Sequence, residues 1–225
     1  AWWDTETGDL KLYPFAPSLS GSCDTPGDAT AVAYSGDFAF VADGPSGLQV
    51  FDISDPTNPR LAGSIGAFYA YGVAVSGDNI YIAASSSGLL VFDITDPANP
   101  TITGTYGTPS PAWDVVVSGD YAFVVDRYAG LQVIDISEPT SLSLVGSCDT
   151  QGNAHGIALS GEHVFVAGGD YGLQVIDVSD PTNPTLAGTY DTSGYTYRVA
   201  VSGDHAFMAD GLSGLEVIDV SDPTN

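Results

Sequence analysis

Short apolar runs separated by turn-forming residues recur along almost the whole chain. In the first complete copy the runs cover residues 30–34, 38–42, 48–53 and 60–64. Each has the length of a β-strand, and the Gly, Asp and Pro residues between the runs are typical of turns. No stretch spaces its apolar residues with the period of a helix. The pattern predicts an all-β chain whose basic unit contains four strands.

Three turn motifs recur in phase with these runs. Ser-Gly-Asp or Ser-Gly-Glu, a Gly-Leu pair, and Asp-Pro-Thr-Asn-Pro or a variant each occur five times, 41 or 42 residues apart, with the first motif beginning at Ser35, Ser76, Ser118, Ser160 and Ser202. Gly can take positive φ and Asp can accept hydrogen bonds from nearby amides in a tight hairpin, whereas Pro cannot continue a strand. Four strands in about 42 residues are typical of one blade of a β-propeller.

The two middle strands carry apolar residues on both faces, as in Phe40-Val41 and Val50-Phe51. This indicates sheets packed on both sides by neighbouring sheets. We therefore expect a five-bladed β-propeller of four-stranded antiparallel blades. A parallel β-helix is the alternative architecture, although its rungs are normally shorter than this repeat.

The ends of the chain indicate how such a ring could close. The last copy stops after its third strand, whereas residues 17–24 align with residues 184–191, a fourth strand. We therefore expect residues 17–23 to complete the last blade, so that residues 17–225 form the propeller and residues 1–16 an N-terminal extension. The extension contains a spare strand-like run, in which Leu10, Leu12 and Tyr13 are candidates for assembly with a neighbouring molecule.

The charge balance excludes some classes of partner. With 28 acidic and 4 basic residues, the formal net charge is -24. Such a surface repels nucleic acids and anionic lipid headgroups, and no apolar run is long enough for a membrane-spanning helix. We expect protein partners, including a second copy of the chain, no nucleic acid, no direct membrane insertion, and an extracellular or cell-surface location.

Cys23 and Cys148 occupy equivalent places in two copies and are expected to be free thiols, with intermolecular pairing as the alternative.

Two phrases carry a resemblance to a known family. Residues 172–184 read Gly-Leu-Gln-Val-Ile-Asp-Val-Ser-Asp-Pro-Thr-Asn-Pro, and residues 199–204 read Val-Ala-Val-Ser-Gly-Asp. They resemble the LVIVD repeat, a β-propeller repeat of bacterial and archaeal surface or secreted proteins, and the resemblance extends over residues 17–225. It implies a propeller that is usually non-catalytic, often a module of a larger extracellular protein, and it brings no catalytic motif.

Positions that differ between the copies are the best candidates for a site. At the start of the first, innermost strand we single out Tyr71, Trp113, Asp114, His155, Tyr197 and Arg198. These residues would surround one mouth of the central channel, where the aromatic rings could stack on a glycan or small ligand and the charged groups could anchor it. Alternatively, the bulky side chains simply fill a narrow channel. A hydrolase using Asp114 and His155 is a weaker alternative, because the common catalytic motifs are absent.

Pairs of carboxylates beside the Pro-containing turns raise the question of calcium. The candidates are Asp52 with Asp55, Asp93 with Asp96, and Asp177 with Asp180. Their repetition in most copies favours a structural role in which each caps the backbone of its turn. We expect no cofactor, with calcium as the one candidate. The sequence as a whole predicts a non-catalytic structural or interaction module that could self-assemble through its N-terminal strand, with ligand binding at the channel mouth as the alternative function.

Overall fold

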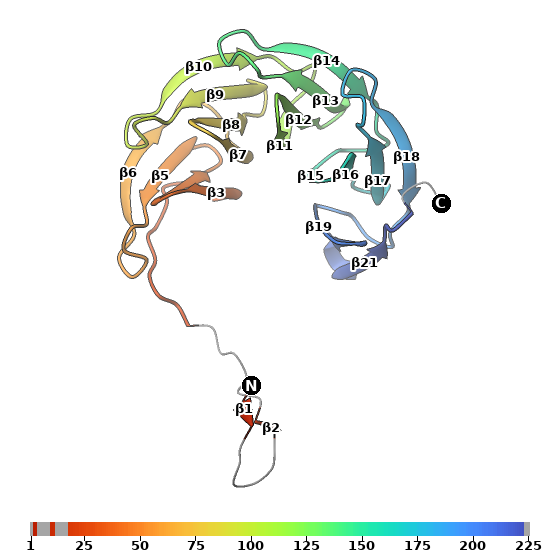
Figure 1. Ribbon diagram of the computed structural model, residues 1–225, viewed down its shortest axis with the longest axis horizontal. Helices are drawn as coiled ribbons and strands as arrows, with labels where there is room; N and C mark the ends of the chain where they lie inside the picture. The colour runs from red at the N-terminus through yellow and green to blue at the C-terminus, as the bar shows by residue number, and fades with distance from the viewer. Residues whose placement is uncertain (1, 4–9, 12–17, 223–225) are drawn as a thin grey trace.

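The computed structural model describes residues 2–3, 10–11 and 18–222. Residues 18–222 form five antiparallel sheets, which we call blades 1 to 5, and the sheets follow one another around a central axis (Figure 1). The first strand of each blade lies innermost and the last lies outermost (Figure 1). The predicted all-β architecture of successive blades is confirmed.

Blades 1 to 4 each contain four strands, and blade 5 contains three. Blade 1 consists of β3 (Ala31–Ser35), β4 (Phe38–Ala42), β5 (Leu48–Asp52) and β6 (Arg60–Ile65). Blade 2 consists of β7 (Gly72–Ser76), β8 (Asn79–Ala83), β9 (Leu89–Asp93) and β10 (Thr101–Tyr106). Blade 3 consists of β11 (Ala112–Ser118), β12 (Tyr121–Asp126), β13 (Gly130–Asp135) and β14 (Ser143–Cys148). Blade 4 consists of β15 (Gly156–Ser160), β16 (His163–Ala167), β17 (Leu173–Asp177) and β18 (Thr185–Tyr190). Blade 5 consists of β19 (Arg198–Ser202), β20 (His205–Ala209) and β21 (Leu215–Asp219), with a 3₁₀ turn at Gly211–Ser213.

Local turn chemistry explains why each copy of the sequence folds in the same way. The Ser-Gly-Asp hairpin of blade 1 pairs Ser35 with Phe38, and the intervening Gly36 has a φ of 56°. Side chains rarely tolerate this conformation, which explains the glycine at the same place in every copy.

Neighbouring blades are joined near the axis by backbone hydrogen bonds. Gly44 pairs with Ala70 and Ser85 with Ala112, the Ala154 amide donates to the Arg127 carbonyl, and Gly169 pairs with Thr196. Four buried apolar clusters fill the spaces between successive blades. The core of the molecule is therefore a series of four blade-to-blade interfaces.

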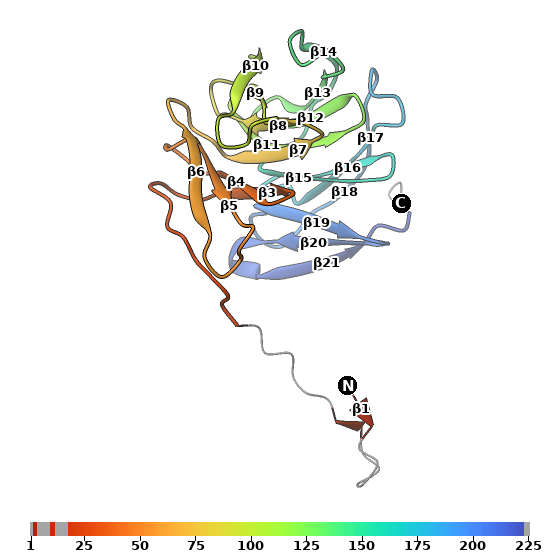
Figure 2. The same ribbon diagram turned by 60° about the vertical axis from the view of Figure 1, so that its left-hand side comes forward.

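A fifth interface, between blades 5 and 1, is not formed within residues 18–222. Gly211 is equivalent to Gly44, yet no backbone pairing links it to the segment that precedes β3. The ring is open between these two blades (Figure 1), and Figure 2 shows β21 at the edge of its sheet with no strand beyond it.

The predicted closure of the last blade by residues 17–23 is therefore not confirmed. Pro17 lies outside the described residues, and residues 18–23 lie against blade 1 rather than on β21. Local motifs determine the strands, but closure depends on the sum of small angles between successive blades, which no local motif specifies.

The N-terminal extension contains a short strand pair. β1 (Trp2–Trp3) is antiparallel to β2 (Leu10–Lys11), with Trp2 opposite Lys11 and Trp3 opposite Leu10. The predicted strand at Leu10 therefore has a partner in its own extension, and the other assembly candidates, Leu12 and Tyr13, lie outside the described residues.

Candidate functional site

The sequence-predicted aromatic residues meet at one mouth of the channel. The rings of Tyr71 on blade 2 and Trp113 on blade 3 are stacked, with centroids 4.6 Å apart and planes 8° apart. Trp113 in turn makes an edge contact with His155 of blade 4, with centroids 4.6 Å apart. The His155 ring lies 5.8 Å from that of Tyr197 on blade 5. A continuous row of rings therefore crosses four blades.

Three residues that the sequence reasoning did not select extend this row. Tyr69 lies against Tyr71, and Tyr195 contacts both His155 and Tyr197. The Arg127 guanidinium lies 5.0 Å from the centre of the Trp113 ring. We call Tyr69, Tyr71, Trp113, Arg127, His155, Tyr195 and Tyr197 the aromatic mouth. A signal was present, because Tyr69 and Tyr195 precede Tyr71 and Tyr197 by two residues, a spacing that places side chains on one side of an extended segment.

Asp114 and Arg198 form an ion pair next to this row. The Arg198 Nη1 donates to Asp114 Oδ2 at 2.7 Å, linking the inner strands of blades 5 and 3. The same guanidinium contacts the carbonyl oxygens of His155 and Thr30, each at 3.4 Å. Arg198 therefore spans the channel and reaches blades 3, 4 and 1. This supports the alternative in which part of the predicted site fills the channel.

The two candidate acid-base groups, Asp114 and His155, both have pKa values far from their ordinary ones. Burial raises the pKa of Asp114 to about 6, and the Arg198 charge opposes this increase. Burial, together with the positive charges of Arg127 and Arg198, lowers the pKa of His155 to about 4. His155 is therefore neutral at pH 7. Its Nε2 lies 2.5 Å from the Tyr195 hydroxyl, while its buried Nδ1 has no hydrogen-bond partner among the described residues.

Several parts of the aromatic mouth remain open to solvent. Tyr197 is 51% exposed and Tyr69 is 39% exposed, and Trp113 and Tyr71 are partly exposed. The Arg127 Nε, which is buried, also lacks a hydrogen-bond partner in the described part of the chain. Buried polar atoms without partners are costly and uncommon in proteins. The site therefore combines exposed ring surfaces with unused hydrogen-bonding capacity.

The carboxylate pairs considered for calcium cap their own turns. Asp52 accepts a hydrogen bond from the Ser54 amide, and Asp55 accepts from the amide and hydroxyl of Thr57. The same pattern holds at Asp93, Asp96, Asp177 and Asp180. Hydrogen bonds from the side chain and backbone of Ser54 and Thr57 lower the pKa of Asp52 and Asp55. Within residues 18–222 we find no group of three or more His, Cys, Asp or Glu placed to hold a metal ion.

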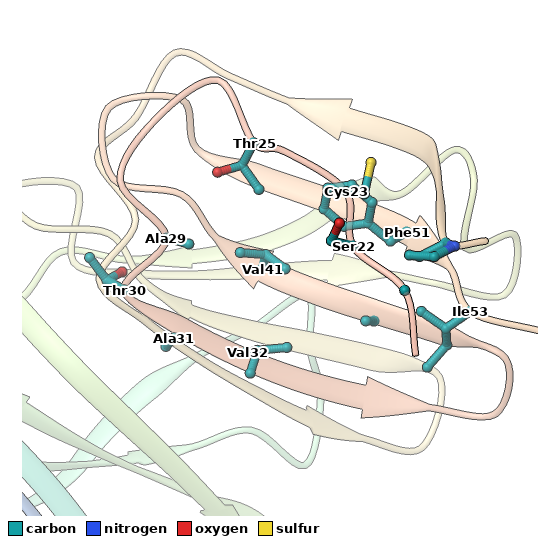
Figure 3. Close-up of a pocket in the computed structure, with 13 residues that line it drawn as sticks. Ser22, Cys23, Thr25, Ala29, Thr30, Ala31, Val32, Val41, Phe51 and Ile53 are labelled. Carbon is teal, nitrogen blue, oxygen red and sulfur yellow. The ribbon is translucent and has the colours of Figure 1, made fainter. Parts of the chain in front are cut away.

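A groove on blade 1 shares no residue with the aromatic mouth. It has a volume of about 450 Å³ and lies between residues 21–25 and one face of blade 1 (Figure 3). Cys23 lines this groove, and neither Cys23 nor Cys148 forms a disulfide within the described residues of one chain. Among the described residues, no helix is long and apolar enough to cross a membrane.

Comparison with protein-family models accounts for the repeat. The LVIVD repeat model matches residues 26–66, 68–108, 110–150, 151–192 and 193–225. The chain belongs to the LVIVD repeat family. Each matched unit runs from the segment before an innermost strand to the end of the same blade, so the family repeat and the structural blade coincide. No curated protein matches the sequence.

Solved structures similar to this LVIVD-repeat chain share its fold. The β-propeller domain of Cps50 (Swd1) from Myceliophteria thermophila aligns with a TM-score of 0.69 at 13% identity, over 90% of this chain and 69% of that one. A functionally unknown protein from Desulfotomaculum acetoxidans DSM 771 aligns with a TM-score of 0.70 at 15% identity, over 88% of this chain and 71% of that one. The computationally designed Ika8 protein aligns with a TM-score of 0.62 at 12% identity, over 88% and 73%. At these identities the likeness shows the β-propeller fold alone.

Proposed function

We propose that this LVIVD-repeat chain is a non-catalytic interaction module, located outside the cell, that binds a glycan or small ligand at its aromatic mouth. The observation that carries the proposal is the row of contacting rings from Tyr71 through Trp113 and His155 to Tyr197. Four different blades contribute to it, at a position where the repeat copies differ. The location outside the cell rests on the acidic composition, with a net charge of -24.

The geometry suggests which ligands would fit. Exposed tyrosine rings beside a tryptophan offer flat apolar surfaces on which a sugar ring or an aromatic group can stack. Arg127 lies over Trp113 and has an unpaired Nε, so a ligand with an acceptor oxygen could use it.

The pairing of Asp114 with Arg198 and the low pKa of His155 argue against a hydrolase at the same place, although the raised pKa of Asp114, about 6, is in the range of a general base. Asp114 is paired with Arg198, and no hydrogen bond links it to His155 within residues 18–222. His155 has little affinity for a proton at neutral pH, because its pKa is lowered to about 4. A general base normally has a pKa close to the working pH.

Binding to a glycan array and a small-molecule panel tests the proposal. We expect wild-type protein to bind at least one compound, and Trp113→Ala and Tyr197→Ala to reduce that binding about tenfold or more. Tyr197 is half exposed, so its substitution should leave the fold intact, which circular dichroism can verify. Tyr34→Ala is the matched control, since Tyr34 is exposed but lies on blade 1, outside the aromatic mouth. Equal binding by wild type and all the variants would overturn the proposal, and turnover of a bound compound would overturn its non-catalytic part.

A further inference from the structure

The two blades beside the opening expose apolar residues that are buried everywhere else in the ring. Leu215 of blade 5 is 68% exposed, whereas its equivalents Leu48, Leu89, Leu131 and Leu173 are at most 1% exposed. Val217 is 53% exposed, and its equivalents Val50, Val91, Val133 and Val175 are at most 4% exposed. On blade 1, Val32 is 67% exposed, against at most 9% for Val73, Val115, Ile157 and Val199. These residues belong to an interface that the other blades form and this pair does not.

The groove on blade 1 has the lining of such an interface. Its apolar lining includes Val32, Ala39, Val41, Phe51 and Ile53 (Figure 3). The equivalent residues of blade 2 are Val73, Ile80, Ile82, Phe92 and Ile94, which pack against Phe40, Leu48 and Val50 of blade 1. The blade 5 equivalents of those three are Phe207, Leu215 and Val217. The groove therefore has the surface that receives this face of a preceding blade.

Residues 18–24 already stand where the fourth strand of a preceding blade belongs. The fourth-strand glycines Gly63, Gly104 and Gly146 each pass so close to the Pro-containing turn of the next blade that a Cβ would collide with a backbone oxygen there. Gly21 passes equally close to the Pro56 oxygen of blade 1. The Gly27 amide then donates to Asp43 Oδ2 at 2.8 Å, as the Gly194 amide donates to Asp210 Oδ2 at 2.7 Å in blade 5.

Blade 5 has the complementary deficiency. Among the described residues, β21 has no fourth strand beside it, and the apolar face of blade 5 toward the opening is exposed. Within one molecule the two apolar surfaces stay exposed, although a hydrogen bond from Arg198 to the Thr30 carbonyl oxygen connects blades 5 and 1 near the axis. Among residues 18–222, no backbone pairing joins these two blades. A second copy brings the same two surfaces together as a continuation of the four interfaces that the chain already forms.

We propose that blade 5 of one copy docks into the blade 1 groove of a second copy, whose residues 18–23 pair with β21 as its fourth strand. This head-to-tail contact goes beyond the proposed ligand binding and uses a different surface. Because the contact is head-to-tail, its repetition gives a closed ring of copies or an open filament. Blade 3 provides the expected register, because Leu131 lies opposite Cys148 and Val133 opposite Gly146. The equivalent pairs between copies are Leu215 opposite Cys23 and Val217 opposite Gly21.

Disulfide trapping tests this register directly. Directly opposed residues on antiparallel strands have Cα atoms about 4.5–5.5 Å apart, within the range that a disulfide requires. In a Cys148→Ser background, Leu215→Cys should cross-link to Cys23 of another copy under mild oxidation, giving covalent oligomers on non-reducing gels. Glu216→Cys is the matched control, because the next residue along the strand points to the other face and should cross-link at least tenfold less.

A residue pair that is already opposed within one copy serves as the positive control. In a Cys23→Ser background, Leu131→Cys should form an internal disulfide with Cys148 and run as a single chain on non-reducing gels, because those residues are paired within blade 3. A monomeric Leu215→Cys protein with an internal disulfide to Cys23 would overturn the proposal by showing that the chain closes its own ring. No cross-link at all in a folded protein would also overturn it. Neither outcome affects ligand binding by the Trp113 site, so the two proposals fail separately.

Discussion

Two leucines at equivalent places in the repeat should differ sharply in their contribution to stability. Leu48 of blade 1 is fully buried, whereas Leu215 of blade 5 is 68% exposed. Replacing each by alanine removes the same atoms from the same position of the same strand. The comparison therefore isolates the effect of the missing blade-to-blade interface.

The magnitudes follow from burial. Leu→Ala in a well-packed core costs about 2–5 kcal/mol, because a cavity remains where the side chain was. Fully burying a leucine contributes about 1.5–3 kcal/mol, and Leu215 has only about one third of its surface buried. We therefore expect Leu48→Ala to lower the free energy of unfolding by about 2–5 kcal/mol, and Leu215→Ala to lower it by less than about 1 kcal/mol.

Urea denaturation followed by circular dichroism measures both free energies of unfolding. If the free energy falls with urea concentration at the same slope in both variants, they expose the same surface area on unfolding. The experiment should be done at a protein concentration where size-exclusion chromatography shows only monomer. If Leu215→Ala then cost as much as Leu48→Ala, blade 5 would be packed inside a closed ring, and the open interface described above would be wrong. At concentrations where copies associate, the Leu215→Ala cost should increase, because association stabilises the folded state.

Three further predictions concern other parts of the molecule. Because His155 has its pKa lowered to about 4 from 6.5, the unfolded chain binds its proton more readily, and stability from this group is lost as pH falls from 6.5 to 4. His155→Gln should remove this loss, so its unfolding free energy relative to wild type should rise by roughly 3 kcal/mol between pH 7 and pH 4, and a flat difference would refute the pKa assignment. Gly21→Ala should displace residues 18–24 from blade 1, because a Cβ would collide with the Pro56 oxygen, and should speed proteolytic cleavage of that segment several-fold, whereas Gly107→Ala, which has open space around its Cβ, should not. Self-association should strengthen as salt is added, because two copies of net charge -24 repel each other across an apolar contact, and weakening by salt would contradict that picture.

Asp114 explains why the wild-type pH profile alone cannot reveal the His155 effect. Burial raises the Asp114 pKa to about 6, so the folded state binds this proton more readily than the unfolded state does. Its contribution to stability therefore falls as pH rises from 4 to 6, opposite in sign to that of His155. The variant comparison separates the two groups.

The strands were predictable from sequence because each depends on residues close in the chain. Gly36 and its equivalents allow the first hairpin of every blade, and a Pro-containing turn ends the third strand of each blade. The closure of the ring was not predictable in the same way. Residues 18–24 do lie in a fourth-strand position, as the alignment with residues 184–191 suggested, but they lie against blade 1, while the outer edge of β21 has no strand beside it among the described residues.

The candidate site was predicted in part for a related reason. Tyr71, Trp113, His155 and Tyr197 share one slot of the repeat, and the ring geometry brings that slot together. Comparing a single slot could not find Arg127, which belongs to the neighbouring hairpin and reaches Trp113 only through its long side chain. The same comparison selected Asp114 and Arg198 as ligand anchors, whereas in the structure they form an ion pair with each other.

The proposed function is tested most directly by hydrogen exchange of the wild-type protein with and without a compound that binds it. Amide protection by the ligand should concentrate at residues 69–71, 113–114, 127–128 and 195–198, which carry the aromatic mouth. Protection at the blade 1 groove or on β21, with none at the aromatic mouth, would contradict the proposal.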